Sequence, residues 1–201
     1  MSKFNLTEDD KIYYDVLKEI GNIGSGNAVT ALAHMLNCKV DMSVPQVRLL
    51  DFKDVGSILG DEEQIMAGVY LMVEGDITGS IMFLLEKDSC KKLIAMLMGS
   101  SPSEGDLSEI EESALKEIGN IITAAYLNSL STLTNLKIYP SVPSLCIDMA
   151  AAILSVPAIE FGLIGDKLLL IENQFSEGIS GYFILVPDLE SYDKIFSSIG
   201  M

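Results

Sequence analysis

Two short segments of this sequence place acidic and carboxamide side chains at intervals that match one side of an α-helix. Asp15, Glu19 and Asn22 lie at positions i, i+4 and i+7, so on a helix they fall within about 60° of one another. The same spacing recurs further along the chain in Ser113, Glu117 and Asn120. A carboxamide offers donors and acceptors at a fixed geometry. One use for such a group on a rigid surface is to position a water molecule.

The two segments belong to an internal duplication. Residues 17–23 recur identically as residues 115–121, 98 positions later. In each copy a proline follows the asparagine by 23 residues, and these prolines are Pro45 and Pro143. An identity of this length with further matches in register is hard to obtain by chance, so the chain is predicted to be written twice.

The duplication predicts one domain over residues 1–201. Its two repeats cover about 8–100 and 106–201, and the polar, turn-rich segment 101–105 is the expected linker. Two strand-bearing halves bury their apolar faces most economically in a shared sheet. The expected fold class is therefore α/β (α+β), with helix–strand–hairpin–helix halves that share a β-sheet and are related by a pseudo-two-fold axis.

Each repeat predicts the same order of elements. Apolar residues at helical spacing come first, with capping signals at Thr7 and Asp10 in one copy and at Ser108 and Glu111 in the other. Between strand and hairpin, the second copy predicts a short helix with Asp148 as its N-cap. The other expected elements are strands at 39–50 and 137–147, a loop at 52–60, hairpins at 64–86 and 167–186, the short helix at 149–154, and closing helices at 89–98 and 189–199.

Composition excludes several classes of function. The net charge is −16, which disfavours a nucleic-acid binder or a protein that docks on an anionic membrane. It favours a soluble partner with a basic rim. The N-terminus lacks a signal peptide and no segment is apolar enough to span a bilayer. The three cysteines form no C-x-x-C pair and there is one histidine, so we expect no metal site and buried, reduced thiols in a cytoplasmic protein.

The row of polar residues on each motif helix, here called the polar line, has an ordinary alternative interpretation. Any one of its residues could be a solvated helix position, and Glu19 could pair with a nearby lysine. The repeat argues against this, because the copies have drifted around the motif. Gly24 and Gly26 of the first copy correspond to Ile122 and Ala124 of the second. Glutamate, glycine, asparagine and proline have stayed the same.

At this point the sequence resembles the CheC family of chemotaxis phosphatases, which includes CheX and FliY. The shared pattern is Asp/Ser-x3-Glu-x2-Asn-x22-Pro, and it occurs twice in full across the chain, as Asp15, Glu19, Asn22 and Pro45 and as Ser113, Glu117, Asn120 and Pro143. Two motifs in about 200 residues look most like CheC itself. FliY carries a further switch domain, for which this sequence is expected to have no room.

The resemblance implies hydrolysis of the aspartyl phosphate on the response regulator CheY. Asn22 and Asn120 match the residue that holds the attacking water, and Glu19 and Glu117 match the acid that docks the regulator. The remaining motif residues are expected to trim the contact or support the site, namely Asp15, Ser113, Pro45 and Pro143. No cofactor of its own is implied, because the regulator carries the Mg²⁺.

The resemblance also implies a second partner, the receptor deamidase CheD. Its expected contact lies at the start of the short helix in the second repeat, at Asp148, Ala150, Ala151 and Ala152. The alternative is an alanine face packed on the sheet. The protein is expected to be a monomer or a heterodimer with CheD. A binding module without turnover and a flagellar-switch component remain as alternative functions.

The two sites are expected to be unequal. The first helix contains Gly21, Gly24 and Gly26, whereas the second retains only Gly119. Each interior glycine costs roughly 0.5–1 kcal/mol of helix stability relative to alanine. This predicts a more rigid and more active second site, unless the glycines allow closer approach of the partner and favour the first.

Overall fold

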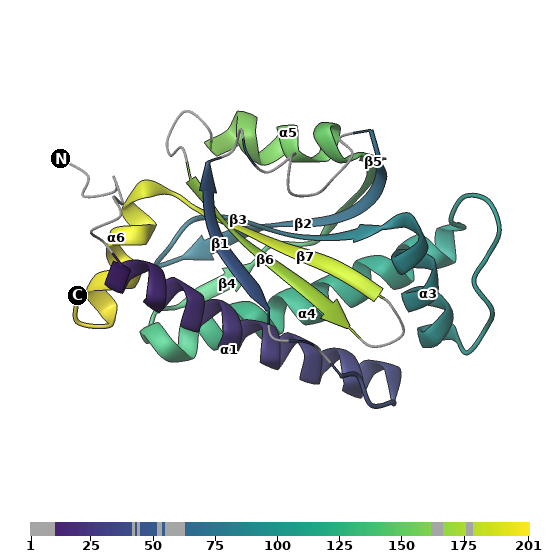
Figure 1. Cartoon of the computed structure of the whole chain (residues 1–201), viewed down its shortest axis with the longest axis horizontal. Coiled ribbons are helices and arrows are strands. Elements are labelled where there is room, and N and C mark those ends of the chain that lie inside the picture. The colour runs from purple at the N-terminus through teal and green to yellow at the C-terminus, as the bar shows by residue number, and fades with distance from the viewer. Residues whose placement is uncertain are drawn as a thin grey trace.

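The fold is a seven-stranded antiparallel sheet with helices on both faces (Figure 1). The computed structural model describes residues 11–41, 43, 45–51, 54, 63–161, 167–175 and 179–201. The helices are α1 (Lys11–Leu36), α3 (Lys87–Met98), α4 (Glu109–Thr134), α5 (Ala150–Phe161) and α6 (Leu189–Ser198). The strands are β1 (Gln46–Asp51), β2 (Ile65–Gly75), β3 (Gly79–Glu86), β4 (Ile138–Pro140), β5 (Ser144–Met149), β6 (Lys167–Phe175) and β7 (Ile179–Pro187).

The two halves exchange strands within the sheet. The strand order is β1-β6-β7-β3-β2-β4, and β5 also pairs with β2. The first-half strand β1 therefore pairs with the second-half hairpin, and the second-half strands β4 and β5 pair with the first-half hairpin. The strands β3 and β7 meet in the middle, where Phe83 pairs with Phe183. This arrangement confirms the expected fold class of duplicated halves that share one sheet.

A pair of reciprocal hydrogen bonds shows the pseudo-two-fold relation in detail. The backbone N–H of Thr78 donates to the hydroxyl of Ser191 at 2.8 Å, and that of Ser180 donates to the hydroxyl of Ser89 at 3.2 Å. Each bond joins the hairpin of one half to the short helix of the other. Buried backbone donors need such partners. In each case a serine hydroxyl of one half accepts the hydrogen bond from a backbone N–H of the other half.

The two faces of the sheet have separate apolar cores. The long helices α1 and α4 cover one face together with α3 and α6, and α5 covers the other (Figure 1). The first core includes Leu115, Tyr126 and Phe183, and the second includes Met66, Ile153 and Leu170. The antiparallel sheet is thus buried on both sides, which explains the near-continuous apolar runs of β3 and β7.

The ends of the long helices follow sequence signals. At the start of α4, Ser108 and Glu111 form the predicted capping box, in which the hydroxyl of Ser108 accepts from the N–H of Glu111. The matching residues Asn37 and Asn135 follow the last residues of α1 and α4 with φ values of 49° and 56°. Asparagine tolerates this left-handed conformation better than most residues. The predicted start of the first helix at Thr7 lies outside the described residues.

Several predicted boundaries were wrong. The strand expected at 39–50 begins only at Gln46, directly after Pro45, which has no backbone N–H for a sheet ladder. The strand expected at 137–147 is divided into β4 and β5 around Pro143. The helix expected at 149–154 is longer, since α5 reaches Phe161. The loop expected at 52–60 lies outside the described residues except for Asp54.

The cysteines do not share one environment. Cys90 is buried, and burial raises the pKa of its thiol to about 12, with the nearby Glu111 carboxylate adding to the effect. Cys38 and Cys146 are exposed. The expectation of buried thiols is therefore correct only for Cys90. No described helix has the combination of length and apolar character that a membrane crossing requires.

Candidate functional site

Glycines hold both motif helices close to the sheet. A Cβ atom on Gly21 would lie 2.7 Å from Val47 Cγ2, and one on Gly119 would lie 2.6 Å from Val69 Cβ. Neither distance leaves room for a side chain, so the glycine of each motif is a packing residue. Gly21 lets α1 pack closely on β1, and Gly119 lets α4 pack closely on β2. The opposite side of each helix therefore faces the solvent.

The predicted polar lines lie on that outward side. Asp15 and Glu19 are exposed and Asn22 is half-buried on α1. On α4, Ser113 and Glu117 are exposed and Asn120 is half-buried. The apolar neighbours Leu17, Ile20, Leu115 and Ile118 point into the core. The structure therefore brings each set of three side chains together on a surface that a macromolecule can reach.

The two asparagines differ in one respect. The Oδ1 atom of Asn22 is buried and accepts no hydrogen bond from any described residue. The carboxamide of Asn120 contains no buried atom that lacks a partner. A buried acceptor without a donor costs free energy of folding. Because this oxygen lies below the surface, a bound partner does not contact it. Both residues are half-buried, so the recorded difference between the two sites is the buried oxygen of Asn22.

The motif prolines lie beside the strands that support the helices. Pro45 is buried and directly precedes β1, and Pro143 is half-buried and directly precedes β5. Both therefore lie immediately before a strand, at a position where the sheet requires no backbone N–H. They shape the support of the motif helices rather than form part of the exposed line.

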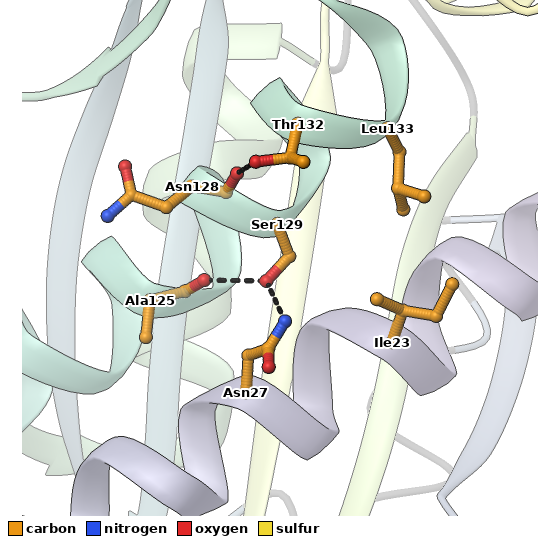
Figure 2. Close-up of a pocket in the computed structure, with 7 residues that line it drawn as sticks. All are labelled: Ile23, Asn27, Ala125, Asn128, Ser129, Thr132 and Leu133. Carbon is orange, nitrogen blue, oxygen red and sulfur yellow. Dashed lines mark hydrogen bonds between the residues drawn. The ribbon is translucent and has the colours of Figure 1, made fainter.

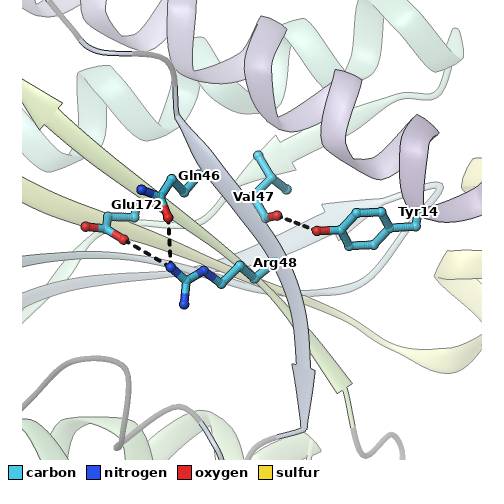
Figure 3. A network of polar contacts seen from close by, with 5 residues as sticks. All are labelled: Tyr14, Gln46, Val47, Arg48 and Glu172. Carbon is cyan, nitrogen blue, oxygen red and sulfur yellow. Dashed lines mark hydrogen bonds and ion pairs between the residues drawn. The ribbon is translucent and has the colours of Figure 1, made fainter. Parts of the chain in front are cut away.

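A further contact holds the first motif in place. The Tyr14 hydroxyl, one residue before Asp15, donates to the carbonyl of Val47 at 2.8 Å (Figure 3). Beside it, Arg48 donates to Gln46 at 2.8 Å and lies 3.9 Å from Glu172 on β6. The second copy has Glu112 in place of Tyr14, so comparison of the repeats offered no signal for this contact.

A pocket of about 320 Å³ lies between the two motif helices (Figure 2). Asn27 of α1 donates to the Ser129 hydroxyl of α4 at 2.8 Å, and Ser129 donates to the carbonyl of Ala125 at 2.8 Å. The remaining lining residues are Ile23, Asn128, Thr132 and Leu133. None of these side chains titrates near neutral pH, so the pocket joins the helices but offers no acid or base.

The helices cross closely near this pocket because α1 has a glycine, Gly24, at the crossing. A Cβ atom on Gly24 would lie 2.9 Å from Cζ of Tyr126 and closer still to two other ring carbons. Gly26, in contrast, has no atom within 4 Å of that position. Gly21 and Gly24 therefore serve packing inside the protein. The expectation that these two glycines admit a partner is wrong.

A second pocket, of about 410 Å³, reaches the first turn of α4. It is lined by apolar residues of β2 and β5 and by charged groups at its rim, including Lys87, Asp106 and Glu112. Cys90 lies at its lining with a thiol whose pKa is raised. A protonated thiol is a weak nucleophile, so the raised pKa disfavours Cys90 as a nucleophile.

The residues predicted for the second partner do not all lie at the surface. Asp148 is exposed but belongs to β5, where its carboxylate accepts from the N–H of Met149 at 2.8 Å, so it is not the residue directly before the helix. Ala150 is buried in the second core, as the alternative interpretation held. Ala151 is exposed and Ala152 is half-buried. Asp148 and these two alanines remain accessible.

The arrangement defines what the surface can do. Each motif presents a carboxylate and a carboxamide, and within the described ranges no group of three or more His, Cys, Asp or Glu could hold a metal ion. A carboxamide cannot act as a nucleophile at neutral pH, but it can bind and orient water. The surface therefore offers, at each motif, an acid and a neighbouring group that can bind and orient water.

Comparison with known proteins agrees with this geometry. The model of the CheC-like family matches residues 14–48 and 110–147, the segments that carry the two motifs. The chain is 34% identical to CheY-P phosphatase CheC of Bacillus subtilis, over 100% of this chain and 99% of that protein.

Solved structures show the same fold. FliY of Thermotoga maritima superposes with a TM-score of 0.73 at 26% identity, over 98% of each chain. A CheX–CheY–BeF3–Mg²⁺ complex of Borrelia burgdorferi matches with a TM-score of 0.54 at 14% identity, over 88% of this chain and 97% of that chain. At this identity the second match establishes the fold alone.

Proposed function

Because this chain belongs to the CheC-like family, we propose that it hydrolyses the aspartyl phosphate of the chemotaxis response regulator CheY. The observation that carries the proposal is the duplicated line of glutamate and asparagine on the outward side of α1 and α4. Each line stands on a helix whose opposite side is fixed by a glycine against a strand. Such a rigid surface can present its side chains to a folded protein partner.

The proposed chemistry uses water as the nucleophile. The water oxygen bonds to phosphorus in line while the bond to the aspartyl oxygen breaks, and both hydrogens of the water end on the released phosphate. The regulator supplies Mg²⁺ for the charge on the phosphoryl oxygens, so the step lacks only an oriented water. Asn22 and Asn120 would hold this water through their carboxamides. Neither residue needs to change its protonation state.

The other motif residues are assigned to docking and support. Glu19 and Glu117 would pair with a cation of the regulator, and both carboxylates are exposed for that contact. Asp15 and Ser113, one turn earlier, would adjust the fit of the docked surface. Pro45 and Pro143 would act indirectly, through the strands that they begin.

The proposal is tested by following the decay of phosphorylated CheY with Mg²⁺ present and this protein at a tenth of its concentration or less. We expect many regulators to be dephosphorylated per molecule of protein, because the motifs position water without being consumed. Decay that stops after one equivalent, or binding without any acceleration, would support an adaptor that only binds the phosphorylated regulator. A flagellar-switch component of that kind would also give this second result.

A second proposed partner is CheD, bound at the junction of β5 and α5. Support comes from exposure on this side of the molecule, where Asp148 and Ala151 are accessible and Val156 and Ile159 of α5 are 43% and 76% exposed. Exposed aliphatic side chains beside an isolated charge are typical of a protein contact. The protein would then be a cytoplasmic monomer or a heterodimer with CheD.

Asp148→Lys is expected to weaken CheD binding by tenfold or more, because it places a cation where the partner meets an anion. The measurement is the dissociation constant by titration calorimetry, with CheY-P turnover as a second readout that should not change. Asp193→Lys, on the exposed side of α6, makes the same change of charge elsewhere. Equal affinities for the two variants would remove Asp148 from the interface.

A further inference from the structure

Each motif also contains a lysine, four residues before its asparagine. Lys18 precedes Asn22 and Lys116 precedes Asn120, within the seven residues that recur identically in the two halves. Both pairs lie inside long, continuous helices. Side chains at i and i+4 are neighbours on a helix surface, with Cβ atoms about 5–6 Å apart. The lysine and the asparagine therefore face the same bound partner.

The charge around these lysines makes their retention informative. The chain carries 29 acidic residues against 13 lysines and arginines. The first nine residues of α4 include Glu109, Glu111, Glu112 and Glu117, and Lys116 is the one basic residue in its 26 positions. In α1, Lys18 is the one basic residue between Lys11 and His34. A cation thus occurs beside the asparagine of each motif, where the neighbouring charged residues are acidic.

Neither lysine has a polar partner among the described residues. Across the part of the chain that the structure describes, no ion pair or hydrogen bond involves the ammonium group of Lys18 or Lys116. Other lysines differ, since Lys39 pairs with Asp41 at 2.7 Å and Lys194 donates to the carbonyl of Asp76 at 2.9 Å. Lys18 is exposed and Lys116 is half-buried. Both ammonium groups are available to a ligand.

We propose that Lys18 and Lys116 bind oxygens of the phosphoryl group that the neighbouring asparagine attacks through its water. This inference rests on the proposed function and adds a substrate contact to it. The transition state spreads negative charge over three equatorial phosphoryl oxygens. The flexible four-carbon stem of lysine can bring its ammonium to one of them, while the carboxamide one turn away holds the water.

The same contact answers an electrostatic problem of the docking. The motif helices bring glutamates toward a phosphorylated aspartate, and like charges at short distance repel. An ammonium between them converts part of this repulsion into a charge-assisted hydrogen bond, which is stronger than a neutral one. Because the phosphoryl group is present only on the activated regulator, the lysines would also favour that form over the unphosphorylated one.

The test replaces both lysines by glutamine, which is one atom shorter and has a similar helix propensity but carries no charge. We expect Lys18→Gln/Lys116→Gln to lower kcat/KM for CheY-P by about tenfold to a hundredfold, the usual range for a hydrogen bond to a charged group. It should weaken binding to CheY carrying beryllofluoride and Mg²⁺, and leave binding to unphosphorylated CheY nearly unchanged. Lys18→Arg/Lys116→Arg should recover much of both losses.

A matched control removes the same charge elsewhere. Lys92→Gln/Lys137→Gln changes two exposed lysines outside the motifs, and general electrostatic attraction would make it equal to the motif variant. Equal kinetics of these two variants, or weakened binding to both forms of CheY, overturns the inference. Absence of turnover by the unmodified protein instead overturns the proposed function. The two failures are therefore distinguishable in one set of assays.

Discussion

Replacing Asn120 by alanine should abolish most of the CheY-P phosphatase activity, whereas replacing Asn22 should leave most of it. The reason is the difference between the two carboxamides. Oδ1 of Asn22 is buried and has no donor among the described residues, but Asn120 has no such buried atom. Loss of the group that orients the attacking water costs about a hundredfold in rate when positioning is the main contribution. Replacing Asn22 should lower the rate by less than about twofold.

Initial rates of CheY-P decay for the two single variants and for the double variant decide this prediction. Asn128→Ala is the matched control, because Asn128 is an exposed asparagine of α4 outside the motif. All four asparagine variants should bind beryllofluoride-activated CheY, since the proposed docking groups are retained. Equal losses at the two sites, or a larger loss with Asn22→Ala, would contradict the assigned inequality.

Gly24→Ala should destabilise the protein, by about 1–3 kcal/mol in the free energy of unfolding. The added Cβ would meet the ring of Tyr126 at distances below 3.0 Å. Tyr126 is fully buried and its ring stacks on that of Phe183 at 5.7 Å between centroids, so it has little room to move. Overpacking of this kind usually costs more than the gain from replacing a helical glycine.

Gly26→Ala is the control, two residues further along the same helix. No atom lies within 4 Å of its Cβ position, so the substitution should stabilise the protein by about 0.5–1 kcal/mol through helix propensity alone. Urea unfolding of both variants measures the two effects with opposite signs. A Gly24→Ala variant as stable as Gly26→Ala would show that α1 and α4 do not cross at Tyr126.

The packing of the glycines in α1 also bears on the expected inequality of the two sites. Glycine content predicted a more flexible first helix, but Gly21 and Gly24 are tightly packed against Val47 and Tyr126. The second copy has Ile122 where the first has Gly24, and Tyr126 where the first has Ala28. Near the crossing, α1 therefore has small residues at the positions where α4 has large ones. The expected advantage of the second site now rests on the buried Oδ1 atom of Asn22, which accepts no hydrogen bond from a described residue.

Much of this protein can be predicted from local signals in its sequence. The repeat of residues 17–23 predicted two equivalent helices, the capping box at Ser108 and Glu111 marked the start of one, and apolar strand-forming segments located the two hairpins. The motif lines of Glu19 and Glu117 were also expected at the surface. Such features depend on contacts between residues that are close in the chain, so periodicity and spacing are sufficient to reveal them.

Other features depend on how the two halves pack together, and no local pattern contains them. The exchange of β1 and β5 between the hairpins, the crossing of α1 and α4 at Gly24, and the burial of Ala150 all result from long-range contacts. The same is true of the covered oxygen of Asn22. Two nearly identical motifs therefore acquire different surroundings, because each helix is packed against a half whose sequence has since diverged.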